Sequence, residues 1–360
     1  MKSHSLIPST ILFLGLAASS SMSVQAHSIK ENIADCDCDA GCFTEEVENF
    51  QCTSDRIKFQ SKALPHHSHT LMKGITGTNQ QFPTPHNLEV GIKRNPQLAD
   101  KPTYTEPGPI GIAVNGVPIF DPSTQGPIQA ATGKPASAME RGELDECGGH
   151  AGRGDDYHYH MAPKCLIEDL GREAIDVKRQ PIGYAFDGFP ILALGWFDSA
   201  NDIEDKLDEC RGVKDASGRY FYNAKSSDDY AILDCFSGTP VGSSRDSWDR
   251  RLDNSGKEIV GIPMKFTVSE FKTVPNGSNS CYVMSGIMGQ TRVQLNSGSV
   301  ENVSGATGSL FYCDQNCYGH FIEKPGAGKG KTLVFDRHVN SCPADLSAAS
   351  NNAFEAYQGN

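Results

Sequence analysis

Apolar and polar residues alternate over short stretches of this chain, and glycine, proline, asparagine and aspartate separate the stretches. Successive side chains of a strand point to opposite faces, so this period predicts β-strands. Residues 109–120 alternate around Asn115-Gly116, a dipeptide typical of tight hairpin turns, and Asp187-Gly188 lies in a matching stretch. We therefore expect one kind of hairpin, used twice.

Further strands are predicted in the C-terminal third, over residues 262–268, 281–284 and 332–335. A helical period is rare, and residues 200–209 give the clearest short helix because Ile203 and Leu207 fall on one of its faces. The chain has 36 glycines and 20 prolines, so it is rich in turns. We predict a mainly β fold with short helices, divided into two or three coupled units because 360 residues exceed one typical core.

Two blocks of sequence recur in the same order. Residues 109–119 resemble residues 181–191, and Leu-Asp-Glu-Cys stands at 144–147 and again at 207–210. Ten positions after each of these cysteines a tetrapeptide begins, Tyr-His-Tyr-His in the first block and Tyr-Phe-Tyr-Asn in the second. This pattern predicts an internal duplication, with copies at 109–165 and 181–235.

The copies differ where the first one carries histidine. His150, His158 and His160 are matched by Val213, Phe221 and Asn223, whereas the tyrosines of the tetrapeptide are kept. In a strand the tyrosines share one face and the histidines the other. We interpret the kept residues as scaffold and the three histidines as a functional site.

Three neutral imidazoles from one strand and the preceding loop are ligands typical of zinc or copper, so a mononuclear site is predicted. The alternative, histidines without a ligand, is weakened because all three are lost together from the second copy. Glu146, Asp155 and Asp156 lie close enough in sequence to orient the rings, or they form a solvated acidic loop.

These motifs also carry a resemblance to a known family. Tyr-His-Tyr-His, the preceding Asp-Glu-Cys-Gly-Gly-His and the following Gly-Tyr-Ala-Phe-Asp-Gly-Phe-Pro-Ile resemble the YHYH domain family of secreted, mostly bacterial proteins. The resemblance extends over roughly residues 60 to 240, because Leu64-Pro65-His66-His67 looks like the family's upstream Pro-x-His segment. It implies a shared fold and site, names no reaction, and makes His67 a fourth candidate ligand, with His66 and His69 as rivals.

The chain is then divided as a signal peptide (1–26), a cysteine-rich acidic leader (27–60), a YHYH domain with its duplication (61–245) and a β-rich C-terminal unit (246–360). Lys2, the apolar stretch 11–18 and the small residues before Ala26 predict a secretory signal cleaved near Ala26. No later segment is apolar enough to span a membrane. The mature chain is expected to be secreted or periplasmic.

All 12 cysteines follow the predicted cleavage point, in three groups of four. Even groups in an exported protein indicate disulfides rather than thiolate metal sites. Each copy has one cysteine in its Leu-Asp-Glu-Cys box and one further on, which predicts the pairs Cys147–Cys165 and Cys210–Cys235. Pairing in the other two groups stays open.

The formal net charge of −12 argues against nucleic acid as a partner, since no basic surface is visible in the sequence. Small molecules, carbohydrates and proteins remain possible partners. The leading hypothesis is an exported transition-metal protein, catalytic if one coordination position holds water. Its rival is a binding module without turnover, in which the histidines are structural and the aromatic residues of both tetrapeptides help to bind carbohydrate or protein.

Three weaker signals are discounted. Residues 325–332 end like a phosphate-binding loop but have Pro325 where its first glycine is required. Cys313, Cys317 and His320 are spaced like metal ligands, although disulfides are favoured in an oxidising compartment. An N-terminal His27 could bind copper, but other features of such copper enzymes are missing. No Gly-x-Ser-x-Gly motif supports acyl transfer.

Overall fold

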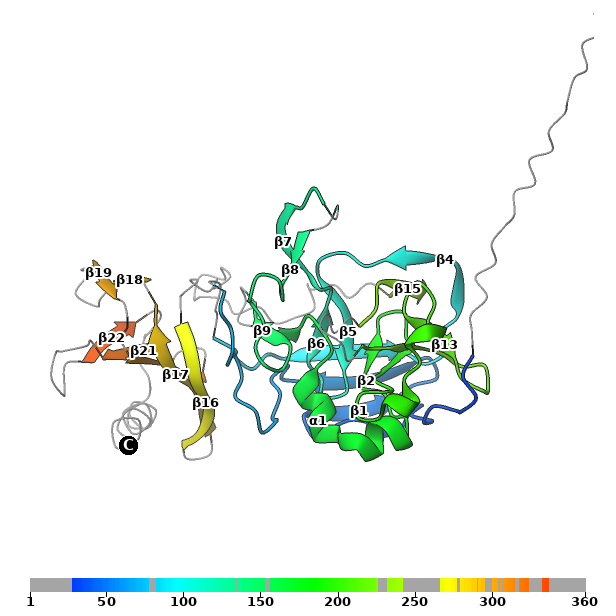
Figure 1. The fold of residues 1–360 in the computed structure, drawn as a ribbon. Coiled ribbons are helices and arrows are strands. Elements are labelled where there is room, and N and C mark those ends of the chain that lie inside the picture. Colours follow the sequence, from blue (N-terminus) through cyan, green and yellow to red (C-terminus); the bar gives the residue numbers. More distant parts are fainter. Residues whose placement is uncertain are drawn as a thin grey trace, which may run out of the picture.

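The computed structural model describes residues 28–77, 82–131, 133, 135–152, 156–225, 232–241, 266–276, 279–289 and short segments between 291 and 336. Strands dominate these residues and helices are few and short, which confirms the predicted mainly β fold (Figure 1). The order of the elements places the YHYH tetrapeptide at the central sheet, and a further β-sheet follows it in the chain.

An eight-stranded sheet forms the centre, in the order β13-β14-β12-β11-β5-β6-β10-β9. Its strands are β5 (Pro109–Ala113), β6 (Pro118–Phe120), β9 (Gly149–Ala151), β10 (Tyr157–Tyr159), β11 (Gly183–Ala185), β12 (Pro190–Leu192), β13 (Gly212–Lys214) and β14 (Tyr220–Asn223). The pairs β5–β6 and β11–β12 are the two predicted hairpins. Their turns hold Gly116 at φ +73° and Gly188 at φ +96°, conformations that glycine adopts without strain.

The strands on either side of the central β5–β11 pair follow the same run of pairings. Moving outward, β5 pairs antiparallel with β6, β6 parallel with β10, and β10 antiparallel with β9. On the other side, β11, β12, β14 and β13 pair in the same three ways. Residues 109–165 and 181–235 therefore contribute equivalent strands in equivalent positions.

Smaller sheets surround this centre. The first is antiparallel and consists of β1 (Val47–Cys52), β2 (Arg56–Ser61) and β3 (Leu88–Lys93). A second pairs β4 (Leu98–Tyr104) with β15 (Cys235–Gly238). A third, the hairpin of β7 (Ser123–Ile128) and β8 (Pro135–Ser137), projects from the body of the molecule (Figure 1).

The C-terminal unit is also a sheet, as the sequence predicted. Its antiparallel strands lie in the order β16 (Phe266–Asn276), β17 (Asn279–Met288), β20 (Thr307–Asp314), β21 (Cys317–Glu323) and β22 (Thr332–Asp336). A further pair consists of β18 (Thr291–Gln294) and β19 (Val300–Val303). The strands predicted at 281–284 and 332–335 lie within β17 and β22, and the one predicted at 262–268 is described from Phe266 onward.

The helix predicted at 200–209 is wrong. Two separate 3-10 turns, Ser199–Asn201 and Glu204–Lys206, occupy this stretch. The carboxylates of Asp198 and Asp202 each accept a hydrogen bond from a backbone N–H two residues on, which favours tight turns over a continuous helix. The described α-helix is instead α1 (Lys164–Arg172), followed by one π-helical turn at Glu173–Val177.

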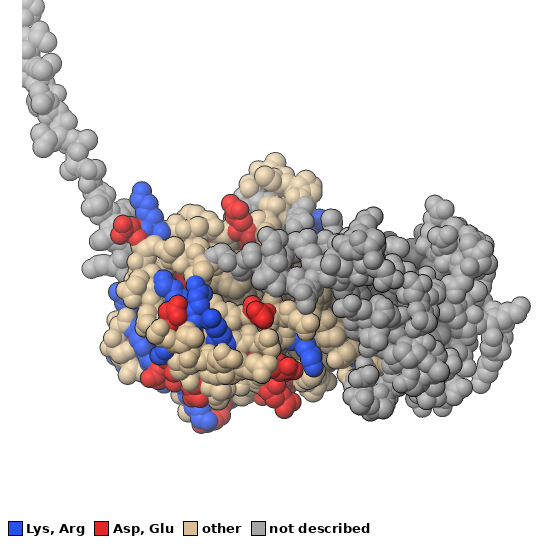
Figure 2. Space-filling view, turned by 180° about the vertical axis from the view of Figure 1, so that it is seen from behind, with Lys and Arg blue, Asp and Glu red and all other residues tan. Residues whose placement is uncertain are grey.

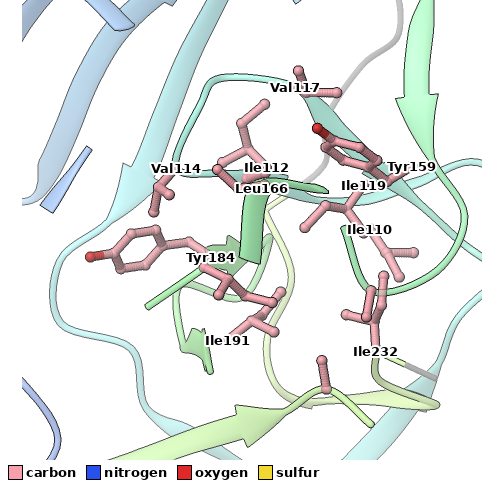
Figure 3. Close-up of a cluster of buried hydrophobic side chains, with 14 of the residues drawn as sticks. Ile110, Ile112, Val114, Val117, Ile119, Tyr159, Leu166, Tyr184, Ile191 and Ile232 are labelled. Atoms are coloured by element: carbon pink, nitrogen blue, oxygen red, sulfur yellow. The ribbon is translucent and has the colours of Figure 1, made fainter. Parts of the chain in front are cut away.

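The core lies between the central sheet and the elements around it. Isoleucines of β5 and β6 meet Tyr159, Leu166 of α1 and Ile191 of β12 in one buried cluster (Figure 3). Phe266 and Met284 of the C-terminal sheet belong to the same cluster, and Phe82 contacts Phe271 with ring centroids 5.9 Å apart. Burial of this apolar surface is what holds the central sheet in place.

Four disulfides lie among the described residues. Cys147–Cys165 and Cys210–Cys235 form as predicted. In the leader the pairs are Cys36–Cys42 and Cys38–Cys52, which resolves a pairing that the sequence left open. Pairing in the C-terminal group falls largely on side chains outside the described part of the chain.

Charged side chains of both signs are interspersed on the face seen in Figure 2, and uncharged residues cover most of it. No continuous basic stripe crosses the described part of that face.

Candidate metal centre

The three predicted histidines come from two neighbouring strands. In the β9–β10 pair, His158 lies directly opposite His150, and His160 is the first residue after the end of β10. The alternation of a strand therefore puts the rings of His158 and His160 on one face. All three side chains are buried, with at most 8% of each residue exposed.

The tyrosines occupy the opposite face, as expected. The rings of Tyr157 and Tyr159 pack edge to face at 85°, and the rings of Tyr220 and Tyr222 repeat this at 88°. All four residues are buried, which assigns them to the core. They offer little surface to a carbohydrate, so this feature of the binding-module hypothesis loses its support.

The Nε2 atoms of the three histidines converge. The distance between the Nε2 atoms of His158 and His160 is 3.1 Å, and that between His160 and His150 is 3.2 Å. Two nitrogens that bind one zinc ion at 2.0–2.1 Å in tetrahedral geometry lie about 3.3 Å apart. The spacing is thus close to that of ligands on a single ion.

Main-chain carbonyls decide which ring nitrogens carry a proton. The Nδ1 of His158 lies 2.9 Å from the carbonyl oxygen of Asp156, and the Nδ1 of His160 lies 2.6 Å from that of Asp121. A carbonyl only accepts, so each Nδ1 must donate, and in a neutral ring the Nε2 then holds a lone pair. Two lone pairs facing each other at 3.1 Å repel unless a cation lies between them.

A proton is a poor candidate for this cation. Burial, with a smaller contribution from the neighbouring His158, lowers the pKa of His160 to about 3. Burial, together with the neighbouring His158 and His160, lowers the pKa of His150 well below its ordinary value. His150 and His160 therefore favour the neutral ring, which is the form that binds a metal ion.

Aromatic and acidic groups fix the ring of His158. Phe120 stacks on it, with centroids 3.9 Å apart and an interplanar angle of 21°. A carboxylate oxygen of Asp156 lies 3.5 Å from its Nδ1, farther than the carbonyl of the same residue. Gly152 passes so near that a Cβ there would lie 2.9 Å from the ring. The surroundings leave the imidazole little freedom to turn.

The loop before His150 is held by Asp145. Its carboxylate accepts hydrogen bonds from the Tyr157 hydroxyl at 2.8 Å and from three backbone N–H groups, those of Met72, Cys147 and Gly149. Burial raises the pKa of Asp145 to about 6, and these donors limit the rise. Asp208 binds Tyr220, Cys210 and Gly212 in the same way in the second half.

Three acidic residues were expected to accept hydrogen bonds from the histidine rings, and the structure places them differently. Only Asp156 lies beside a histidine, because Glu146 is ion-paired with Lys73 at 3.4 Å and Asp155 lies outside the described residues. The sequence did not single out Asp145 or Asp121. Asp145 could have been found from the sequence, because the second block repeats it as Asp208. Asp121 could not, because it acts through its backbone carbonyl, which every residue has.

The other candidate ligands do not join this cluster. A ring nitrogen of His67 lies within 4.8 Å of the sulfurs of Cys147 and Cys165, which are joined in a disulfide. His69 contacts Glu168 at 3.4 Å, and His66 is exposed. Within the described part of the chain, only His150, His158 and His160 form a group of histidines that could share an ion.

The second half of the sheet has no comparable group in its described residues. The side-chain amide of Asn223 bonds the backbone N–H and C=O of Leu194, and Val213 and Phe221 belong to an apolar cluster. The residues that stand in place of the three histidines thus fill the equivalent position with apolar packing and local hydrogen bonds. The discounted signals at His27 and 325–331 lie outside the described residues, as do the side chains of Cys313, Cys317 and His320.

The segment 89–213 matches the family model described as YHYH protein. It contains all three clustered histidines. It begins at residue 89 and therefore does not include His67. No curated protein and no solved structure matches the chain. No helix in the described residues is long and apolar enough to cross a membrane, and the four disulfides fit an extracellular protein.

Proposed function

Starting from the YHYH match and the converging nitrogens, we propose that this chain is an exported protein that binds one transition-metal ion through His150, His158 and His160. The observation that carries the proposal is the approach of two Nε2 atoms to 3.1 Å, with the Nδ1 of each ring within hydrogen-bond distance of a backbone carbonyl. A buried group of this kind is stable when a cation accepts the lone pairs. Three imidazoles leave a further coordination position for water or substrate.

Copper and zinc are the metals of this proposal, because neutral imidazoles bind both. Such an ion supplies either a redox centre or a Lewis acid when bound. The residues around it hold the ligands: Asp121 and Asp156 fix the proton of each ring on Nδ1, and Phe120 covers one face of His158. The proposal extends to no particular reaction, and His67 is not among its ligands.

Export is part of the proposal and rests on residues 1–26, which lie outside the described residues and read as a signal peptide. The disulfides of the mature part support it. We also propose that residues 109–165 and 181–235 are copies of one ancestral unit. The equal run of strand pairings and the matching aspartate loops at Asp145 and Asp208 support this origin.

Metal content of the natively exported protein tests the proposal. Wild type is compared with His158→Ala, His160→Ala and, as a control, His66→Ala, whose ring is exposed and outside the cluster. We expect about one equivalent of copper or zinc in the wild type and the control, and a loss of about tenfold or more in the two cluster variants. Sub-stoichiometric metal in all four proteins contradicts the proposal.

A further inference from the structure

A cavity of about 550 Å³ lies at the end of the central sheet that is farthest from the histidines. Its walls come from the leader around residues 33–37, the connection at 92–98, the β11–β12 hairpin and the β13–β14 turn. None of the three clustered histidines lines it. Its size is that of sites for small molecules, so it is a second candidate site.

The charge of the lining differs from that of the whole chain. Four basic side chains line the cavity against two acidic ones, although the chain carries a formal charge of −12. The basic residues are Lys93, Arg94, Lys214 and Arg219, and the acidic ones are Asp35 and Asp37. A concave surface with this excess of positive charge attracts anions.

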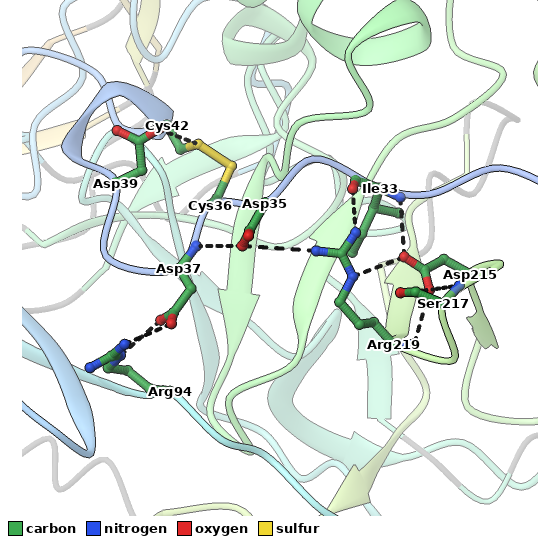
Figure 4. Close-up of polar contacts among 10 residues, drawn as sticks. All are labelled: Ile33, Asp35, Cys36, Asp37, Asp39, Cys42, Arg94, Asp215, Ser217 and Arg219. Carbon is green, nitrogen blue, oxygen red and sulfur yellow. Dashed lines mark hydrogen bonds and ion pairs between the residues drawn. A yellow bond between two sulfur atoms is a disulfide. The ribbon is translucent and has the colours of Figure 1, made fainter.

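The two arginines are already engaged and give the cavity rigid walls (Figure 4). Arg94 donates to both carboxylate oxygens of Asp37, at 2.8 and 2.7 Å. Arg219 donates to Asp215 at 3.0 Å and to the carbonyl of Ile33, so it ties the leader to the β13–β14 turn. The ion pairs fix the walls before any ligand arrives.

The two lysines are the cations left for a ligand. Neither Lys93 nor Lys214 has a side-chain hydrogen bond or ion pair with the described residues, and both are half-buried. A carboxylate within reach of either amine gains a charge-assisted hydrogen bond without breaking an existing one.

A buried hydroxyl indicates what the rest of the ligand needs. Tyr184 is 6% exposed and lines the cavity, and its hydroxyl has no hydrogen-bond partner among the described residues. Phe43 stacks on its ring at 13°, and Figure 3 shows the hydroxyl directed away from the isoleucine cluster. Buried hydroxyls are nearly always bonded, and a ligand oxygen satisfies this one once the atoms that cover it move aside. The exposed amides of Asn95 and Gln97 add donors and acceptors at the rim.

We propose that this cavity binds a small sugar acid, with the carboxylate at Lys93 and Lys214 and a ring hydroxyl at Tyr184. The two lysines would bind the negative charge of the ligand, and the tyrosine and the amides would bind its hydroxyl groups. The mixed lining, which also includes Ile57 and Ile92, fits a sugar ring with both C–H and O–H groups better than a bare inorganic anion. The site is independent of the proposed metal.

Three probes separate charge from hydroxyl recognition in titrations of the full mature chain. Galacturonate carries both features, galactose has the hydroxyls without the charge, and inorganic phosphate has charge without a sugar ring. We expect galacturonate to bind about tenfold more tightly than either of the others, and to weaken as salt rises. Equal binding of galactose or phosphate contradicts the proposal, as does absence of galacturonate binding at about 10 mM.

Variants locate the site. Lys214→Gln is expected to weaken galacturonate binding about tenfold and Tyr184→Phe about fivefold. Tyr184→Phe keeps the stacked ring, and Lys93→Gln replaces Lys214→Gln if circular dichroism shows the latter to be unfolded. Lys58→Gln, an exposed lysine elsewhere, and His160→Ala should leave binding unchanged. Unchanged binding in both folded cavity variants overturns the proposal, whatever the metal analysis gives.

Discussion

The Asp145 loop offers the sharpest test of how the scaffold supports the histidines. Tyr157→Phe removes the hydroxyl that donates to Asp145 at 2.8 Å, in a place where Tyr157 is 0% and Asp145 6% exposed. A hydrogen bond to a charged acceptor contributes about 1.5–3 kcal/mol. Asp145 keeps its three backbone donors, so we expect a loss of about 2 kcal/mol in the free energy of unfolding at pH 8.

Tyr220→Phe is the matched control, because its hydroxyl donates to Asp208 at 2.7 Å in the equivalent loop. Asp208 is half-buried, and water can replace the lost donor there. We therefore expect a smaller loss, about 1 kcal/mol. The first variant should also lower metal affinity, since its loop carries His150, while the second should not.

The cost of Tyr157→Phe should depend on pH. Burial raises the folded-state pKa of Asp145 from the ordinary 3.8 to about 6, so the folded chain binds this proton more tightly than the unfolded chain. The contribution of Asp145 to stability is then fully present below pH 3.8 and is lost as pH rises through 6. At pH 5 the carboxyl is mostly protonated, and we expect the cost of the variant to fall below about 1 kcal/mol.

Urea unfolding at pH 8 and pH 5 measures these differences, with the fluorescence of Trp196, which packs against the core, as one probe. Equal losses for Tyr157→Phe and Tyr220→Phe, or a larger loss for Tyr157→Phe at pH 5 than at pH 8, refute the reasoning. A metal affinity that falls equally in both variants refutes the assignment of the Asp145 loop to the site.

Three further predictions concern the disulfides, acid and chelation. Replacing the Cys147–Cys165 pair by alanines should lower stability by about 3 kcal/mol and reduce metal content, whereas replacing Cys210–Cys235 should cost about the same and leave metal content unchanged; urea unfolding and elemental analysis check both. Because burial lowers the pKa of His160 to about 3, protons compete weakly for its Nε2, and the protein should retain metal on dialysis at pH 5; release with a midpoint near pH 6.5 argues against a buried site. If the protein is first held at a free metal concentration of about 100 times Kd, removing the metal with a chelator should lower the free energy of unfolding by about 3 kcal/mol. An unchanged urea midpoint contradicts metal binding to the folded state.

Local pattern was enough to predict much of the sheet. The alternation over 109–120 gave β5 and β6, and the contrast between the two tetrapeptides separated buried tyrosines from clustered histidines. Both depend on a period of two residues, which is a property of a strand itself. The disulfides Cys147–Cys165 and Cys210–Cys235 followed from equivalent positions in the two blocks.

Contacts between distant segments could not be predicted in this way. The parallel pairing of β6 with β10 brings Asp121 and Phe120 to the histidines, and nothing in the residues near Tyr159 indicates that partner. His67 is a similar case, because the resemblance suggested a ligand whereas the fold places its ring beside a disulfide. At 200–209, aspartates that bond nearby N–H groups outweighed a weak helical period.

Anomalous X-ray diffraction from crystals of the natively exported protein, recorded on both sides of the copper and zinc absorption edges, tests the metal centre most directly. The account predicts one strong peak about 2.0–2.1 Å from the Nε2 atoms of His150, His158 and His160. An anomalous peak that lies beside other residues contradicts the account. So does a map with no anomalous peak between the three nitrogens.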